Sequence, residues 1–523
     1  MNRFRWSVRV ALLIGLLVSV IGAASATWQP VQRISATLPS GRDVASYAIS
    51  PDSTLVLYTA DIEFANRRAL YSVPIGGGLG SQLSPAPIVG GVLYQFDWTP
   101  DSSRVVYMGT FDNLAAAKIY SIGPNATNKQ TISDGIPGQS VFFEIASNTH
   151  ILVTTLIAPG TFEIYAVRID GVGTAIKLNK TLPVGGSVKE AHPSADGEWV
   201  VYRGDANTDE VFQLYTVRMN GTDHTSLSGV NINGGDVLEF AVAPVGARVV
   251  WTGDLLVDEQ VNLFSRTINV PDTLVALDTS NSFDAERPRI SPDGSTVAYV
   301  VNWVNEGEQL WRTPIDAAEP QQASLKYGSN NDVDIFTFTF SPNSRYVIYL
   351  TDANDATKRL VYSHDVVVGG SNETLSASNM LDFQIAPDSR QVVMRSSDNE
   401  KLWIAPIDVD FNEDAITNLA AGRTVKQYQI APQSDYVIYR ADRNNLDTEE
   451  LFAVPARLNV DPATQTTKLN SLFSTDNDVT SFKLSNQGDV VYLADSVADD
   501  DKYELYARRN QWSVYLPLVV NGQ

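Results

Sequence analysis

Cysteine is absent from the 523-residue chain. Disulfides, thiolate nucleophiles, cysteine-ligated zinc and a lipid anchor on an N-terminal cysteine are therefore excluded. Acidic residues outnumber basic ones by 60 to 38, and the formal charge of −22 argues against nucleic acid as a partner, because phosphate binding requires basic surface. Histidine is scarce, and its four copies lie in separate segments from which no metal cluster or catalytic triad is expected: His150, His192, His224 and His364.

Familiar catalytic motifs are missing too. The chain contains no G-x-S-x-G, no H-E-x-x-H, no P-loop and no G-x-G-x-x-G that opens a helix. Helical periodicity is essentially absent, and the strand pattern described below leaves no room for a separate α/β catalytic domain.

After residue 26 no stretch is apolar enough to span a membrane. Residues 1–26 are typical of a secretory signal peptide, with Arg3, Arg5 and Arg9 before the apolar run VALLIGLLVSVIGAA and an Ala-Ser-Ala cleavage site at its end. The run is shorter than the ~20 residues that cross a bilayer, which favours cleavage over an uncleaved anchor. The sequence therefore predicts an exported protein, periplasmic, cell-surface or extracellular, with no transmembrane segment after cleavage.

One phrase, best written S-P-D-G followed by a hydrophobic strand, recurs ten times. The position of its proline serves as a marker, and successive markers are separated by about 48 residues: Pro51, Pro100, Ser147, Ala195, Pro244, Pro292, Pro342, Pro387, Pro432 and Asn486. Such regular internal repetition predicts a repeat architecture.

Each unit is predicted to form four short strands. The first leads into the S-P-D-G element, which suits a type I turn, and the second is β-branched and aromatic. A weaker fourth strand ends the unit. The third strand carries an aliphatic-aromatic pair in every unit: Leu70-Tyr71, Ile119-Tyr120, Ile164-Tyr165, Leu214-Tyr215, Leu263-Phe264, Leu310-Trp311, Val361-Tyr362, Leu402-Trp403, Leu451-Phe452 and Leu505-Tyr506. Four strands at this period predict the blade of a β-propeller.

These motifs resemble the WD40-like PD40 repeat of TolB-type propellers. FDAERPRISPDGSTVAYV at 283–300 is the closest match, and the resemblance extends over about residues 30–510. It implies an all-β propeller, and propellers of this type serve as scaffolds, transport accessories and gating domains of peptidases.

Residues 27–511 are assigned to the propeller. Ten units predict one ten-bladed ring, which is favoured because no linker interrupts the spacing near 265–285, or alternatively two five-bladed rings. The segment 28–41 is expected to provide the missing fourth strand of the last blade. The apolar C-terminal tail, residues 512–523, competes for that place.

Two faces of the first strand have different compositions. The residue four places before the marker is aromatic in eight of the ten units, which predicts packing between blades. Charged residues of both signs occur three and five places before the marker. They predict either a wet channel that binds a ligand or pairing of charges across blades, for example Glu144 with His192 and Glu239 with Arg287. The candidate channel residues are Asp97, Glu144, Glu190, His192, Glu239, Arg287, Arg289 and Asp382.

The loops between second and third strands are rich in acids and predict an anionic face. Two segments have spacings that suggest calcium, the one cofactor that is considered, although the Gly and distal Glu of a calcium loop are missing from the first. The alternative is a solvated acidic rim. The candidate ligands are Asp205, Asn207 and Asp209, and, in a different turn, Asp408, Asp410 and Asn412.

The expected function follows from these features. An acidic loop face and a channel of mixed charge favour a non-catalytic propeller that binds another protein or a cell-envelope polymer. The alternative is a carbohydrate-active hydrolase or lyase that uses channel carboxylates as acid and base or nucleophile.

Overall fold

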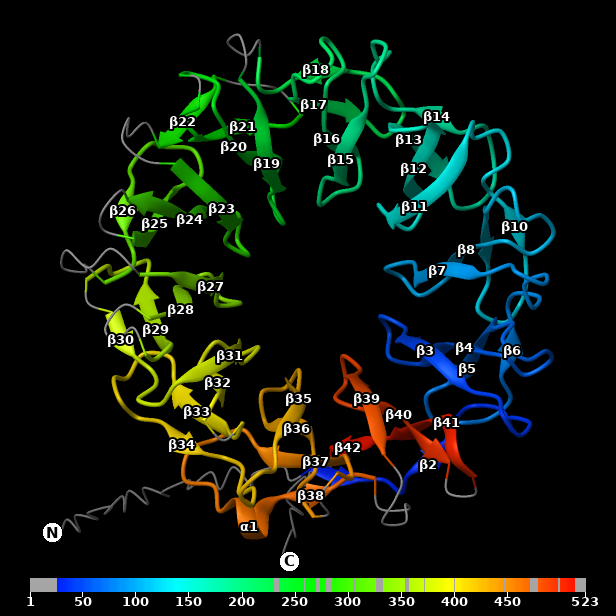
Figure 1. Cartoon of the computed structure of the whole chain (residues 1–523), viewed down its shortest axis with the longest axis vertical. Coiled ribbons are helices and arrows are strands. Elements are labelled where there is room, and N and C mark those ends of the chain that lie inside the picture. Colours follow the sequence, from blue (N-terminus) through cyan, green and yellow to red (C-terminus); the bar gives the residue numbers. More distant parts are fainter. Residues whose placement is uncertain are drawn as a thin grey trace, which may run out of the picture.

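The chain forms a single closed ring of ten four-stranded antiparallel sheets around a central opening (Figure 1). This confirms the ten-bladed ring and excludes two five-bladed rings. The computed structural model describes residues 26–229, 235–257, 259–269, 273–278, 284–303, 307–325, 333–352, 357–370, 372–398, 400–444, 447–470, 478–496 and 499–512.

Blade 1 shows the common plan. Its strands β3 (Val44–Ile49), β4 (Leu55–Ala60), β5 (Ala69–Pro74) and β6 (Ser81–Gln82) pair in chain order, from the channel outward. The fourth strand is the shortest in every blade, with two to four residues. The marker turn joins the first two strands.

Blades 2 to 9 repeat this order. Blades 2 to 5 consist of β7 (Leu93–Trp98), β8 (Val105–Gly109), β9 (Lys118–Ile122), β10 (Gln130–Thr131); β11 (Gln139–Ile145), β12 (His150–Ala158), β13 (Thr161–Arg168), β14 (Ile176–Lys177); β15 (Val188–Pro193), β16 (Trp199–Gly204), β17 (Gln213–Arg218), β18 (Thr225–Ser226); and β19 (Val237–Val242), β20 (Arg248–Gly253), β21 (Asn262–Thr267), β22 (Val275–Asp278). Blades 6 to 9 consist of β23 (Asp284–Ile290), β24 (Thr296–Trp303), β25 (Gly307–Pro314), β26 (Gln321–Gln322); β27 (Ile335–Phe340), β28 (Tyr346–Thr351), β29 (Leu360–Asp365), β30 (Asn372–Thr374); β31 (Met380–Ile385), β32 (Gln391–Ser396), β33 (Leu402–Pro406), β34 (Asp414–Ala415); and β35 (Val425–Ile430), β36 (Tyr436–Ala441), β37 (Glu450–Pro455), β38 (Thr467–Lys468).

The N-terminal segment closes the ring. Blade 10 consists of β39 (Val479–Leu484), β40 (Val490–Ser496) and β41 (Asp499–Arg508), and its fourth strand is β2 (Gln32–Arg33), as the sequence predicts. The competing C-terminal segment begins elsewhere, because β42 (Asn510–Trp512) pairs with β1 (Ala26–Trp28) in a separate two-stranded ribbon. Residues 1–25 and 513–523, most of the predicted signal peptide and tail, lie outside the described residues.

The described residues contain one helix, α1 (Pro462–Gln465), which Asp461 caps by accepting the Ala463 N–H. None of their helices is long and apolar enough to cross a membrane.

Aromatic rings form the core between and within blades. Tyr47, Phe143 and Phe482 from the predicted aromatic column are buried, and the cluster around Leu57 and Tyr107 joins blades 1 and 2, which confirms inter-blade packing. Burial of each ring contributes roughly 1.5–3 kcal/mol. In seven blades an aromatic of the second strand stacks on one of the third, at 5.1–5.7 Å between centroids: Tyr58–Tyr71, Tyr107–Tyr120, Tyr202–Tyr215, Trp251–Phe264, Tyr349–Tyr362, Tyr439–Phe452 and Tyr492–Tyr506.

Every innermost strand contains a β-bulge near its start. In blade 1, Val44 pairs with Ala60 and Ser46 with Thr59, so Ala45 has no partner, and the same shift occurs at the equivalent position in eight other blades. In blade 6 the bulge lies further along the strand, where Arg287 and Pro288 stand between the pairs Glu286–Val300 and Arg289–Ala298. A bulge redirects the extra side chain out of the regular alternation. Several of these extra residues are exposed hydrophobics: Tyr94, Val141, Leu238 and Leu381.

The ring has two distinct faces. The turn face contains the marker turns and the turns between third and fourth strands. The loop face contains the connections between blades and the loops between second and third strands.

Candidate functional site

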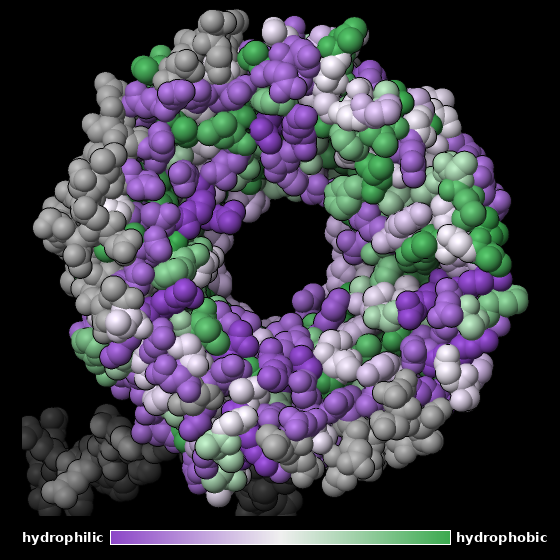
Figure 2. Space-filling view, in the orientation of Figure 1, coloured by the Kyte–Doolittle hydropathy of each residue, from purple (hydrophilic) through white to green (hydrophobic). Residues whose placement is uncertain are grey.

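The channel is open through the ring, and its rim is mostly hydrophilic (Figure 2). All predicted channel residues lie on the innermost strands, β7, β11, β15, β19, β23 and β31. Their hydrogen bonds show which of these side chains are used to hold neighbouring strands and blades together.

His192 joins blades 3 and 4. Its Nδ1 lies 3.2 Å from Glu144 Oε2, and its Nε2 lies 3.1 Å from Glu190 Oε1. Hydrogen bonds to these two carboxylates, Glu144 first, raise the pKa of His192 to about 9, so the ring is an imidazolium at neutral pH that donates to both. The predicted pairing of Glu144 with His192 is confirmed, and all three side chains are still partly exposed.

The predicted pairing of Glu239 with the Arg287 side chain is wrong. Arg287 lies in the bulge of blade 6 with φ of 53°, and it is its backbone N–H that donates to Glu239 Oε1, at 2.6 Å. The guanidinium instead donates to the Ile335 carbonyl of blade 7 at 2.7 Å and to Glu308 in the third strand of its own blade. A period-two pattern cannot reveal this reversal, because the bulge breaks the period.

The remaining channel candidates are separated. Asp382 pairs with Arg395 in its own blade and accepts the Tyr428 hydroxyl of blade 9 at 2.7 Å. Burial raises the pKa of Asp97, which accepts the Trp98 N–H at 2.7 Å. Arg289 is exposed. The structure therefore brings together Glu144, Glu190 and His192, and links Glu239 to the Arg287 backbone, but does not collect the eight residues in one pocket.

Glutamines and a lysine of the channel wall act as clamps that the sequence did not predict. The Gln95 amide donates to the Phe143 carbonyl at 2.6 Å and accepts the Phe143 N–H at 3.2 Å. Gln427 contacts Phe482 in the same way, and Lys483 closes the ring by donating to the Tyr47 carbonyl at 2.7 Å. Gln95 and Gln427 lie five places before their markers, as Glu239 does, and Lys483 lies three places before its own. This shared position in the repeat is the sequence feature that could have revealed them. These contacts favour inter-blade pairing as the main role of this wall.

The first Asp of each acidic loop is structural, which corrects the interpretation of these loops as a wholly solvated rim. Buried Asp205 accepts the N–H of Ser187, at the start of its blade, and that of Glu210, in its own loop. Asp61 does the same for Asp43 and Asn66, both at 2.8 Å. An aspartate recurs ten places after the marker, and this column was the signal: Asp61, Asp205, Asp254, Asp352 and Asp442.

These contacts bear on the calcium candidates. Both oxygens of Asp205 face backbone N–H groups, and the Asn207 amide donates to Gln213 at 2.6 Å. Asp410 accepts the Thr374 N–H of blade 7 at 2.6 Å. Among the described residues no group of three or more His, Asp or Glu is arranged to hold a metal. Calcium stays a prediction, including for Asp209, Asp408 and Asn412.

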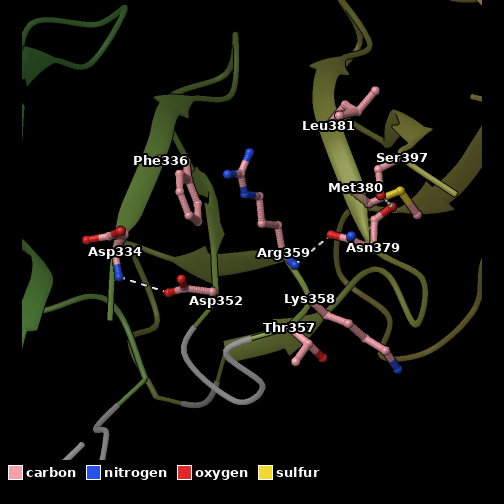
Figure 3. A pocket seen from close by; sticks show the side chains of 10 residues that line it. All are labelled: Asp334, Phe336, Asp352, Thr357, Lys358, Arg359, Asn379, Met380, Leu381 and Ser397. Carbon is pink, nitrogen blue, oxygen red and sulfur yellow. Dashed lines mark hydrogen bonds between the residues drawn. The ribbon is translucent and has the colours of Figure 1, made fainter. Parts of the chain in front are cut away.

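A cleft of about 460 Å³ opens on the loop face between blades 7 and 8. Arg359, which precedes β29, extends into it, between Phe336 of β27 and Leu381 of β31 (Figure 3). Its guanidinium carbon lies 4.0 Å from the centroid of the Phe336 ring. Arg359, Phe336 and Leu381 are not among the eight channel residues that the sequence predicts.

Exposed hydrophobic side chains are most numerous on the loop face of blades 1 to 3, and others lie farther round the same face: Val184, Leu238, Leu256, Val257 and Leu381. We call the set on blades 1 to 3 the apolar arc: Phe64, Val89, Val92, Tyr94, Leu114, Val141, Phe142 and Ile157. Figure 2 shows hydrophobic surface over blades 2 and 3, at the right of the ring. On the turn face, exposed hydrophobics are scattered over several blades: Leu79, Val172, Val245, Val367, Val368, Val409 and Phe411.

No protein-family model and no curated protein matches the chain, so the PD40 assignment stays a resemblance. Solved structures do match. One, from a study of two prolyl endopeptidases, is 13% identical with a TM-score of 0.36 and covers 69% of this chain and 54% of its own. An oligogalacturonate lyase from Vibrio parahaemolyticus is 12% identical with a TM-score of 0.36, covering 79% and 96%. A putative TolB from Agrobacterium tumefaciens is 16% identical with a TM-score of 0.27, covering 47% and 83%. The chain thus spans about half the length of the prolyl endopeptidase, and similarity at this level carries no argument about function.

Proposed function

We propose that this protein is an exported, non-catalytic β-propeller that binds another protein or a cell-envelope polymer through its loop face. The observation that supports this proposal is the apolar arc. Contiguous exposed hydrophobic surface of this kind marks interaction sites, whereas scattered single residues need no explanation.

The arc is continuous where blades 1 and 2 meet. Val89 is 80% exposed, Tyr94 55% and Leu114 56%. The loop that contains Val89 touches that of Leu114, since a Cβ on Gly90 would lie 3.6 Å from the Leu114 side chain. A cleft of about 290 Å³ between blades 1 and 2 is lined by Val92 and Tyr94. Apolar side chains of a partner have both a surface and an indentation to occupy.

The alternative, a carbohydrate-active hydrolase or lyase, requires channel carboxylates that converge on a substrate. Glu144 and Glu190 share one imidazolium, Asp382 is paired with Arg395, and Glu239 accepts a backbone N–H. Their role as inter-blade links favours the scaffold. The double variant Glu190→Gln, Glu239→Gln separates the two functions, because it abolishes a hydrolase or lyase and leaves loop-face binding nearly intact.

The scaffold proposal is tested by capture from a cell-envelope extract on the immobilised full chain. Tyr94→Glu with Leu114→Glu places two charges in the arc, and Leu79→Glu with Val245→Glu is the matched control on the turn face. We expect a species retained by the native chain and by the control but lost with the arc variant. If no captured species depends on the arc, or if both variants lose it equally, the proposal is refuted.

A further inference from the structure

The cleft between blades 7 and 8 depends on an arginine at one position of the repeat. Arg359 lies two residues before the aliphatic-aromatic pair of the third strand, and of the ten units only blade 1, with Arg68, also has arginine there. The other units have these residues at that position: Ala117, Phe162, Phe212, Val261, Glu308, Glu400, Glu449 and Tyr503. Arg68 lines the equivalent cleft between blades 1 and 2, where Ala45 takes the place of Phe336.

Arg359 is held in position, and no carboxylate among the described residues neutralises it. Its backbone N–H donates to Asn379 Oδ1 of blade 8 at 2.8 Å, and its guanidinium lies over the Phe336 ring. Among the described residues, no carboxylate lies within 4.0 Å of this guanidinium. By contrast, Arg287 and Arg440 pair with acids next to the channel. An aromatic ring beneath a guanidinium fixes its plane and leaves its N–H donors at the edge available.

The surroundings of Arg359 combine two apolar walls with further polar side chains, among them Thr357, Lys358 and Asn379. Phe336 forms one wall, and Leu381, 39% exposed, forms the other (Figure 3). Asn379 uses its oxygen to accept the Arg359 backbone N–H, and its amide nitrogen is a further donor in the lining of the cleft. The nearby acids do not close this space: Asp352 accepts the Asp334 N–H at 2.9 Å, and the Asp334 side chain points away from Arg359 in Figure 3.

We propose that this cleft binds the free C-terminal carboxylate of a peptide chain whose last side chain is apolar. A planar guanidinium matches a carboxylate with two parallel hydrogen bonds. Phe336 and Leu381 then cover the terminal side chain. An acidic sugar would also supply a carboxylate, and several other lining residues of the cleft are polar. The two side chains that flank the guanidinium, Phe336 and Leu381, are however apolar, and they suit a terminal side chain better than hydroxyl groups.

This inference names one class of partner for the loop face and so rests on the proposed function, but its site is distinct from the apolar arc. Binding is measured by calorimetry on the full chain with two probes, acetyl-Ser-Ala-Leu with a free carboxylate and the same peptide as its C-terminal amide. We expect the acid to bind at least tenfold more tightly than the amide. Arg359→Gln should abolish that difference, and Leu381→Ser should weaken binding of the acid several-fold.

Arg68→Gln is the matched control. It removes the equivalent arginine from the cleft between blades 1 and 2, where Ala45 takes the place of the Phe336 ring. It should leave affinity for the acid unchanged. Each altered side chain is at least partly exposed, and an unchanged melting temperature shows that each variant is folded. Equal binding of acid and amide, or equal losses with Arg359→Gln and Arg68→Gln, would overturn the proposal. Binding of glucuronate that depends on Arg359, without binding of the peptide, would also overturn it and assign the cleft to an acidic sugar. None of these outcomes depends on the arc variants used for the proposed function.

Discussion

The two faces of the ring are held by different chemistry. On the turn face, a serine hydroxyl in one marker turn accepts an N–H from the turn before it, as Ser344 does from Asp293 at 2.9 Å and Ser389 from Asn343 at 3.0 Å. On the loop face, buried aspartates such as Asp205 accept backbone N–H groups. The loop face therefore uses buried carboxylates in several blades, whereas the turn-face links use neutral groups next to water.

The turn face also shows that its serine can be dispensed with. In blades 4, 5, 6 and 10 glycine occupies that position, as Gly197, Gly246, Gly294 and Gly488. A Cβ on Gly294 would lie 2.6 Å from the Val245 carbonyl oxygen of the preceding turn. Close backbone approach thus replaces the hydroxyl at that junction, which teaches that one repeat can join its neighbour in two ways.

The largest effect is expected on the loop face. Asp205→Ala leaves two N–H groups without their acceptor and should lower the free energy of unfolding by about 3 kcal/mol. Asp209→Ala, in the same loop but exposed, should change it by less than about 0.5 kcal/mol. Urea unfolding of both variants measures the difference, and similar values for the two would remove the distinction between the faces.

Glycine junctions should rank next. Gly294 and Gly246 have φ of 72° and 80°, so alanine at either position costs about 1 kcal/mol for the left-handed conformation. Among the described residues, no atom from outside its own turn lies within 4 Å of the place that a Cβ on Gly246 would take, whereas Gly294 has such a neighbour. Gly294→Ala should therefore cost about 2 kcal/mol in total. Equal losses in urea unfolding would show that close approach does not join blades 5 and 6.

Serine junctions should be weaker. Ser344→Ala removes one neutral hydrogen bond from Asp293, which is exposed and can bond to water instead. The expected loss is about 1 kcal/mol. A loss of unfolding free energy as large as that of Asp205→Ala would show that the hydroxyl links of the turn face contribute as much stability as the carboxylates of the loop face.

The channel wall offers a smaller, pH-dependent contrast. The folded-state pKa of His192, about 9, lies above its ordinary value of 6.5, so the stabilisation is fully present below pH 6.5 and is lost as the pH rises through about 9. The melting temperature of the native chain should exceed that of His192→Gln by an amount that shrinks over this range. The side chain is 44% exposed, which keeps the effect small. A constant difference from pH 6 to 10 would show that the imidazolium does not link blades 3 and 4.

No effect at all is expected from a chelator. Asp205 directs both oxygens to backbone N–H groups, and EDTA should leave the melting temperature unchanged in buffer without added calcium. A clear fall, reversed by calcium, would establish that the acidic loops bind this ion.

Much of the architecture could be predicted because repeats make each position visible ten times. The spacing of the markers predicts ten blades, and the aromatic column around Phe143 and Phe482 predicts their packing. The bulge could not be predicted, since a single extra residue present in all ten units alters no spacing. It is the bulge that turned the Arg287 N–H toward Glu239 and exposed Tyr94 and Leu381 on the loop face.

The candidate sites were less accessible to sequence for a related reason. An aspartate at the start of an acidic loop looks like any other solvated acid until its N–H partners are known, as for Asp61 and Asp205. Arg359 becomes distinctive only through the ring of Phe336 beneath its guanidinium, a contact between two elements that the sequence of neither reveals.

The brevity of the outermost strands has a consequence for how copies of this protein meet. Ten sheets present ten open edges at the circumference, and each is a potential template for a strand from another molecule. Strands such as β6 and β10, with only two residues, offer too few unpaired groups to guide such an addition. The short outer strands therefore limit the pairing of strands between molecules at the circumference of the ring, even though ten sheet edges lie there.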